Sequence, residues 1–275
     1  MEQAYPSSSS SDRAAAVQES PFDEIIEYFT QREPRGTDTW NPLTIDEEFW
    51  HRLRLFAALK WALPKCGTTM SEARILDVGC GVGRSTRALI EFGAKPENLV
   101  GIDLRESAIE YAQSRNPAIP YRVVHGLDDW PPAGSFDICT QCTVFSSIRG
   151  VESRRSVAAM MERAVIDGGH IFWWDSLRAN PIAGGDTLSP EALFENSKIV
   201  DSETVPLRPS LYEAIRFNGR RVSYVSKLIQ RVVGFSATHR ATLFRKEANG
   251  SVGSGSLVGG SGLVAGETEE AGSPR

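Results

Sequence analysis

The stretch Ile75-Leu76-Asp77-Val78-Gly79-Cys80-Gly81-Val82-Gly83-Arg84 decides the fold class of this chain. An apolar run comes first, three glycines follow at alternate positions, and residues 85–92 continue with a helical pattern. In α/β sheets, ligands bind beyond the carboxyl end of a strand, where the chain turns into its helix. Glycines at such a turn allow positive φ and a close approach of the ligand to the backbone. The stretch therefore predicts a strand, a ligand-binding turn and a helix.

The same strand–helix order repeats after this stretch. Hydrophobic patterns predict five strands in succession: 74–78, 99–102, 121–124, 136–140 and 170–174. Helices are expected after the first two strands, and a helical stripe from Val157 to Val165 is ended by Asp167-Gly168-Gly169. Two later strands, 199–206 and 235–244, enclose a helical stripe at 222–232. Repeated units of this kind imply a parallel sheet with helices on both faces, and a late antiparallel strand is common in such sheets.

Composition divides the chain into four segments. Residues 1–20 are polar, with five consecutive serines, and are expected to be disordered. Residues 21–70 hold two amphipathic stripes, which predict an N-terminal helical cap; residues 71–248 form the core, and residues 249–275 a Gly/Ser-rich tail. The first stripe consists of Phe22, Ile25, Ile26 and Phe29, and the second of Phe49, Leu53, Phe56 and Leu63.

Charge and cysteine usage exclude several classes of protein. The net charge is −5, and a protein that follows nucleic acid phosphates usually carries a basic excess, so nucleic acid is not the favoured partner. The four cysteines include one CxxC pair, Cys139 and Cys142, without a second pair or neighbouring histidines, so buried thiols are favoured over a metal site. No apolar run of about 18 residues and no signal-peptide core occurs. We therefore expect no membrane association and a cytoplasmic protein.

Two features separate the possible cofactors of the glycine turn. A dinucleotide fingerprint needs a third glycine at position 84, but this position is Arg84, and the spacing is G-x-G-x-G. Asp103 follows the second strand, 20 positions after Gly83, where an acid can accept hydrogen bonds from a ribose diol. An adenosine-bearing cofactor other than NAD(P) is therefore favoured, although an NAD(P)-dependent oxidoreductase stays a rival that an NADH titration would test.

Residues 77–83, together with Gly101-Ile102-Asp103, resemble the first two motifs of the class I S-adenosylmethionine (SAM)-dependent methyltransferases. The similarity extends over about residues 40–246. Residues 141–148 and Trp174-Asp175 with Asn180-Pro181 resemble a bacterial subgroup that tailors small molecules and natural products. The resemblance implies a Rossmann-like seven-stranded sheet whose last strand is antiparallel, with an N-terminal helical lid.

Carried over by position, the resemblance also implies a cofactor site. The glycines and Cys80 would line the methionine part of SAM, with Asp77 near its amino group, and Gln141 and Cys142 would close over that part. Asp103 would hold the ribose and Leu104 would pack on the adenine. The acid that meets the adenine amino group is displaced by one position in this chain, to Asp128 beside Leu127. The expected cofactor-binding residues are Asp77, Gly79, Cys80, Gly81, Gly83, Asp103, Leu104, Leu127, Asp128, Gln141 and Cys142.

Methyl transfer from a sulfonium requires a nucleophile held in line with the breaking bond, and a hydroxyl acceptor also requires a base. Asp175, at the carboxyl end of the fifth strand, and His51, in the helical cap, are the favoured bases; His125 is a further possibility, and His170, at the opposite edge, is expected to be structural. Some methyltransferases use no base. An aromatic acceptor pocket would draw on Trp40, Trp50, Trp130, Phe145, Trp174 and Tyr212.

Several methyltransferase subclasses are disfavoured. Residues 140–143 lack the Asn/Asp-Pro-Pro-aromatic run of base and glutamine N-methyltransferases, no Pro-Cys pair marks a cytosine C5 nucleophile, and Thr140 is uncharged where magnesium-dependent catechol enzymes carry acids. We therefore expect metal-independent methylation of a small molecule, at oxygen in preference to nitrogen because oxygen is more frequent in the family. RNA or protein methylation and a non-catalytic SAM-binding module remain alternatives, and the oligomeric state is not predicted.

Overall fold

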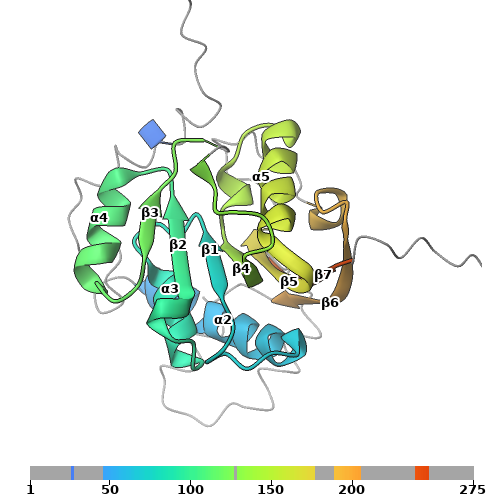
Figure 1. The fold of residues 1–275 in the computed structure, drawn as a ribbon, viewed down its shortest axis with the longest axis horizontal. Helices are drawn as coiled ribbons and strands as arrows, with labels where there is room; N and C mark the ends of the chain where they lie inside the picture. The colour runs from blue at the N-terminus through green and yellow to red at the C-terminus, as the bar shows by residue number, and fades with distance from the viewer. Residues whose placement is uncertain (1–25, 28–45, 127–128, 177–188, 206–238, 248–275) are drawn as a thin grey trace, which may run out of the picture.

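The computed structural model describes residues 26–27, 46–126, 129–176, 189–205 and 239–247 (Figure 1). These residues form a seven-stranded sheet in the order β3-β2-β1-β4-β5-β7-β6. The strands are β1 (Ile75–Val78), β2 (Leu99–Asp103), β3 (Tyr121–Val123), β4 (Phe136–Cys142), β5 (Val165–Ser176), β6 (Ser197–Val205) and β7 (His239–Lys246). Strands β1 to β5 pair in parallel, and β7 is antiparallel to both β5 and β6. The mostly parallel sheet with an antiparallel last strand is confirmed.

Helices cover both faces of the sheet, as its apolar strands require. They are α2 (Asp46–Ala62), α3 (Arg84–Glu91), α4 (Glu106–Arg115) and α5 (Val151–Ala164), with 3₁₀ turns η3 (Leu63–Cys66), η4 (Pro96–Asn98), η6 (Phe145–Ser147) and η8 (Pro190–Ala192). Side chains of α2, α3 and α4 share one core with alternate strand residues such as Ile75 and Phe172. Side chains of α5 share the second core with the intervening residues, such as Leu76 and Trp173.

The strand order places a crevice between β1 and β4. From β1 the chain moves outward through β2 to β3, then returns to the other side of β1 as β4. The connections after β1 and β4 therefore leave neighbouring strands toward opposite faces of the sheet, α3 on one face and α5 on the other (Figure 1). Ligands of open α/β sheets bind outside the carboxyl ends of the strands at such a switch point.

Helix α2 packs into the sheet core by a face that the sequence did not indicate. The second predicted stripe included Phe49 and Leu53, but each is 41% exposed, whereas Leu55 and Leu59 are buried. The predicted helix is present, and Phe56 and Leu63 of the stripe pack on the core. Phe49 and Leu53 do not, because hydrophobic spacing alone does not tell which of two apolar faces meets the sheet. Of the first predicted stripe, only Ile26 lies within the described residues.

Strand β5 begins five residues earlier than predicted. Helix α5 ends at Ala164, and Val165, expected at the end of the helical stripe, already pairs with Phe136. The register between β4 and β5 then shifts, and Gly168 has a φ of 79°. A glycine inside a strand often marks a bulge. Asp167-Gly168-Gly169 therefore interrupts a strand instead of ending a helix.

Several of the predicted segments lie wholly or mostly outside the described residues. Residues 1–20, 222–232 and 249–275 lie outside the described residues, as does most of residues 21–45. In the part of the chain that the structure describes, no helix has both the length and the apolar content needed to cross a bilayer.

Leu59→Ala should lower the free energy of unfolding by about 2–5 kcal/mol, because it removes a fully buried side chain from the core shared by α2 and the sheet. Leu53→Ala, on the same helix but exposed, is the control and should change stability by less than about 0.5 kcal/mol. Urea denaturation measures both values. Equal effects of the two substitutions would show that α2 is not anchored by this face.

Candidate active site

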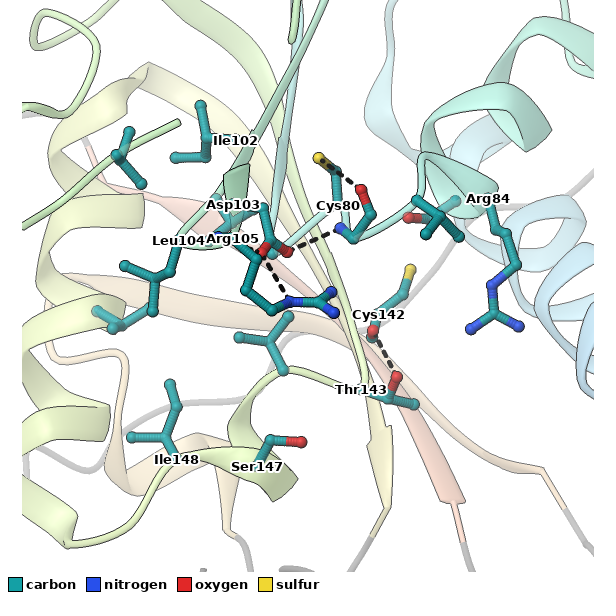
Figure 2. Close-up of a pocket in the computed structure, with 18 of the residues that line it drawn as sticks. Cys80, Arg84, Ile102, Asp103, Leu104, Arg105, Cys142, Thr143, Ser147 and Ile148 are labelled. Atoms are coloured by element: carbon teal, nitrogen blue, oxygen red, sulfur yellow. Dashed lines mark hydrogen bonds and ion pairs between the residues drawn. The ribbon is translucent and has the colours of Figure 1, made fainter. Parts of the chain in front are cut away.

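A cavity lies at the carboxyl ends of β1, β2 and β4 (Figure 2). Its wall includes the glycine turn after β1, the end of β2 and the turn after β4, and α2 contributes a further side. The lining residues are Ile26, His51, Leu55, Val78, Gly79, Cys80, Gly81, Val82, Arg84, Ser85, Ile102, Asp103, Leu104, Arg105, Val124, Gly126, Trp130, Cys142, Thr143, Val144, Ser147, Ile148 and Val157. The cavity therefore occupies the crevice that the strand order creates.

The glycine turn needs its glycines for two physical reasons. Gly79, Gly81 and Gly83 have φ angles of 63°, 53° and 75°, in the left-handed region that side chains disfavour. A Cβ added to Gly79 would also lie 2.4 Å from Cγ2 of Val144, and one added to Gly83 would lie 2.6 Å from the Tyr121 hydroxyl oxygen. Gly79 and Gly81 line the cavity, whereas Gly83 faces Tyr121 behind it.

Asp103 ends β2 with its carboxylate at the cavity wall. Its Oδ2 atom accepts a hydrogen bond from the backbone N–H of Gly81 at 2.8 Å. Its Oδ1 atom accepts one from the backbone N–H of Arg105 at 3.0 Å and one from Nε of Arg105 at 3.2 Å. The carboxylate thereby joins the turn after β1 to the start of α4.

Asp77 is buried beneath the glycine turn and does not line the cavity. Its carboxylate accepts hydrogen bonds from the hydroxyls of Ser85 at 2.7 Å, Thr86 at 2.6 Å and Thr140 at 2.9 Å. Burial raises the pKa of this carboxyl, and the three hydroxyl donors lower it in part. Asp77 connects β1 to α3 and to β4, which supports the turn from below.

The turn after β4 closes another side of the cavity. Cys142 and Thr143 line it, whereas Gln141 is fully buried and its Oε1 atom accepts a hydrogen bond from the N–H of Val144 at 3.0 Å. Thr143 has a φ of 63°, rare for a β-branched residue, and its N–H donates to the carbonyl of Trp174 at 2.8 Å. Strained backbone of this kind is common at functional sites.

The two candidate bases occupy different environments. His51 lines the cavity, with its ring centroid 4.9 Å from that of Trp174. Burial, together with the positive charge of Arg84, lowers the pKa of His51 to about 3, so the ring is neutral at pH 7. Asp175 is fully buried, does not line the cavity, and accepts hydrogen bonds from the N–H groups of Ser146 and Ser176. Of the two, only His51 faces the cavity.

The predicted aromatic pocket is partly assembled. Trp130 lines the cavity, while Phe145 and Trp174 are fully buried in the two cores. Trp174 lies between His51 and His239, with ring centroids 4.9 Å and 5.5 Å away. Trp40, Tyr212 and the side chain of Trp50 lie outside the described residues, as do Leu127 and Asp128.

The structure adds cavity residues that sequence reasoning missed. Arg84 was considered only as a missing glycine, and Arg105 not at all, yet both side chains line the cavity (Figure 2). Leu55 and Ile148 add apolar wall from elements distant in sequence. Cys80 and Cys142, which the sequence predicted at the cofactor site, also line the cavity, and burial raises the pKa of both thiols well above the usual value. Of the missed residues, only Arg105 had a signal in the sequence, because it follows the predicted ribose-binding Asp103 by two positions.

Comparison with known proteins agrees with this geometry. Residues 75–169, which include the glycine turn and Asp103, match the protein family described as "Methyltransferase domain". This match covers about a third of the chain. The N-methyltransferase NodS from Bradyrhizobium japonicum, solved in complex with S-adenosyl-L-homocysteine, has the same fold, with a TM-score of 0.58 at 18% identity over 82% of this chain and 100% of that chain.

Curated relatives match this chain over shorter spans. Ribosomal protein L11 methyltransferase from Burkholderia multivorans is 33% identical over 97 residues, which are 35% of this chain and 30% of that protein. Ubiquinone biosynthesis O-methyltransferase from Methylococcus capsulatus is 32% identical over 112 residues, which are 38% of this chain and 44% of that protein. The chain therefore spans less than half the length of these relatives.

Gly79→Ala should destabilise the protein more than Gly134→Ala, by about 1–3 kcal/mol. The two glycines have nearly equal φ angles, 63° and 62°, so backbone strain is matched, but a Cβ at Gly134 meets nothing within 4 Å. Adding Val144→Ala to the Gly79→Ala variant should restore most of the difference. Urea denaturation of the four proteins checks this, and equal losses at the two glycines would contradict the contact with Val144.

Asp175→Asn should reduce the loss of stability between pH 4 and pH 7. Burial raises the pKa of Asp175 from 3.8 to about 6, so the folded protein holds this proton more tightly than the unfolded chain does. The resulting stabilisation is largest at low pH and is lost as the pH rises through 6. The test is the free energy of unfolding of both proteins at several pH values; parallel curves would mean that Asp175 ionises normally in the folded state.

Proposed function

We propose that this chain is a SAM-dependent methyltransferase that acts on a small-molecule acceptor, preferentially at oxygen and without a metal ion. One observation carries the proposal: the glycine turn after β1 and the carboxylate of Asp103 line the same cavity at the switch point of the sheet. On one side of the cavity the glycines leave room for a ligand to approach the backbone closely. On the other side the carboxylate can accept hydrogen bonds from the hydroxyls of a ribose diol.

The lining residues fit the parts of SAM. Gly79 and Gly81 leave room for the methionine portion beside the turn of Cys142 and Thr143. Asp103 is suited to the ribose hydroxyls. The apolar lining suits the adenine, with Leu104 as the predicted stacking residue. It also comprises Ile102, Val124, Trp130 and Ile148.

The other predicted cofactor residues would act by positioning. Asp77 and Gln141 do not line the cavity, but hydrogen bonds tie them to α3 and to the turn after β4. Gly83 allows the close approach of Tyr121 behind the turn. Asp77 remains our prediction for the neighbourhood of the methionine amino group, and Asp128 for the adenine amino group.

When bound, SAM supplies a methyl group already activated by its sulfonium charge. The chain then has to exclude water, orient the acceptor and accept a proton where the acceptor is a hydroxyl. His51 is the candidate proton acceptor because it faces the cavity. With a pKa of about 3 it is a weak base, which favours an acceptor whose proton is readily lost, such as a phenol, an enol or a carboxylic acid. We assign Asp175 to holding η6 in place, since its oxygens already accept two backbone N–H groups.

Support for the acceptor class comes from sequence features. The resemblance of residues 141–148 to small-molecule tailoring enzymes and the net charge of −5 favour a small molecule over RNA. One relative is named an O-methyltransferase, another a ribosomal protein methyltransferase, and each is matched over less than half of its length. A protein acceptor is therefore the second candidate. We place the reaction in the cytoplasm.

Asp103→Ala should weaken the binding of S-adenosylhomocysteine at least about tenfold, because the ribose loses a charged hydrogen-bond acceptor. Calorimetry measures the affinity. The unmodified protein is also incubated with isotope-labelled SAM and host extract, and the products are separated by size. It should transfer the label to small molecules and not to protein or RNA, and the Asp103→Ala variant should give less labelled product.

The control is Asp137→Ala. Asp137 is also an aspartate and lies in β4, but it pairs with Arg74 and does not line the cavity. Its affinity for S-adenosylhomocysteine should match that of the unmodified protein. Equal affinity in the Asp103→Ala variant would refute the ribose assignment, and label found in protein alone would refute the small-molecule acceptor.

A further inference from the structure

The side chain of Arg105 folds back into the cavity. Arg105 precedes α4 at the N-cap position, but its side chain makes no capping hydrogen bond. Instead Nε donates to Oδ1 of Asp103 at 3.2 Å, and only 13% of the Arg105 side chain is exposed. One guanidinium nitrogen lies 3.4 Å from the point that a Cβ on Gly81 would occupy. The guanidinium therefore lies beside the glycine turn, among the side chains of the cavity wall (Figure 2).

The hydrogen-bonding capacity of Asp103 is limited. A carboxylate has about four lone-pair sites on its two oxygens. Three donors already use it: the N–H of Gly81, the N–H of Arg105 and Nε of Arg105. The two backbone donors are held by the glycine turn and by the start of α4, so they cannot leave without unfolding those segments. The side-chain donor can leave by rotation.

A ribose diol brings two further hydroxyl donors to this carboxylate. With three donors in place, only about one lone-pair site remains. The diol and all three existing donors together exceed what the carboxylate can accept. The hydrogen bond from Nε of Arg105 is the one that can break when the diol binds. The guanidinium of Arg105, beside Gly81, also occupies space at the wall of the cavity.

We propose that Arg105 sets the affinity for the cofactor by holding Asp103 in the cofactor-free protein and releasing it when the ribose binds. The inference rests on the proposed function, because it takes the diol of SAM as the ligand of Asp103. Part of the binding free energy is then used to break the Arg105–Asp103 ion pair. Removing the guanidinium removes that cost.

Two ligands and three variants test this. S-adenosylhomocysteine carries adenine, ribose and an amino-acid carboxylate, whereas 5′-methylthioadenosine carries the adenine, the ribose and a methylthio group but no amino-acid part. Arg105→Ala should tighten the binding of both ligands by a similar factor, at least about threefold, because both use the diol. Arg115→Ala is the control: it removes the same charge from the exposed end of α4, outside the cavity, and should leave both affinities unchanged. Calorimetry measures each dissociation constant.

Arg105→Ser is the third variant and guards against a folding defect. A serine at this N-cap position can accept a hydrogen bond from the first turn of α4, so it compensates for the lost ion pair. Thermal melting without ligand shows that each variant is folded. Arg105→Ser should tighten both ligands as Arg105→Ala does.

The alternative outcomes are distinct. Weaker binding of S-adenosylhomocysteine with unchanged 5′-methylthioadenosine would mean that Arg105 binds the amino-acid carboxylate, and the proposal would be overturned. Unchanged affinity for both ligands would also overturn it, because Asp103 would then accept the diol without losing Arg105. If neither ligand binds the unmodified protein or any folded variant, the proposed function itself fails.

Discussion

The carboxylate of Asp103 is the interaction on which the site depends. It accepts hydrogen bonds from the backbone of Gly81 and of Arg105, so it joins two turns that leave neighbouring parallel strands. The N–H of Cys80 in the glycine turn donates to the carbonyl of Ile102 in β2 at 2.9 Å. The carboxylate of Asp103 adds a charged acceptor that connects the two turns themselves. The group proposed to bind the ribose is therefore also a structural support of the cavity.

A second buried carboxylate supports the cavity from below. Asp77 gathers hydroxyl groups from α3 and β4, and Gly79 allows Val144 to pack directly against the glycine turn. The wall formed by β1, β2 and β4 is thus held by charged hydrogen bonds and by close packing. The opposite wall comes from α2, through His51 and Leu55. The wall formed by the strands is rigid, which suits a cofactor that is the same in every reaction. The wall formed by α2 belongs to a separate helix, so its residues can differ according to the methyl acceptor.

The environment of the candidate bases fits a reaction in which the cofactor carries the activation. Burial lowers the pKa of His51 and raises that of Asp175, and in each case it disfavours the charged form. Neither group combines cavity access with strong basicity. This favours our proposal that the described residues act by positioning the acceptor more than by proton abstraction with a strong base.

The sequence alone determined the sheet class, the glycine turn and the placement of Asp103, because these depend on residue spacing along single elements. Periods of two and 3.6 residues and the order of strands and helices are local properties of the chain. Matching family motifs to Asp77, Gln141 and Asp175 placed these residues near the cavity, but their side chains turned out to be used inside the protein. The buried face of α2 was likewise not recoverable, since Leu55 and Leu53 are both apolar and only contact with the sheet distinguishes them. Only the tertiary structure showed the ion pair between Arg105 and Asp103 and the ring contact between His51 and Trp174, because these contacts depend on how side chains and elements meet in space.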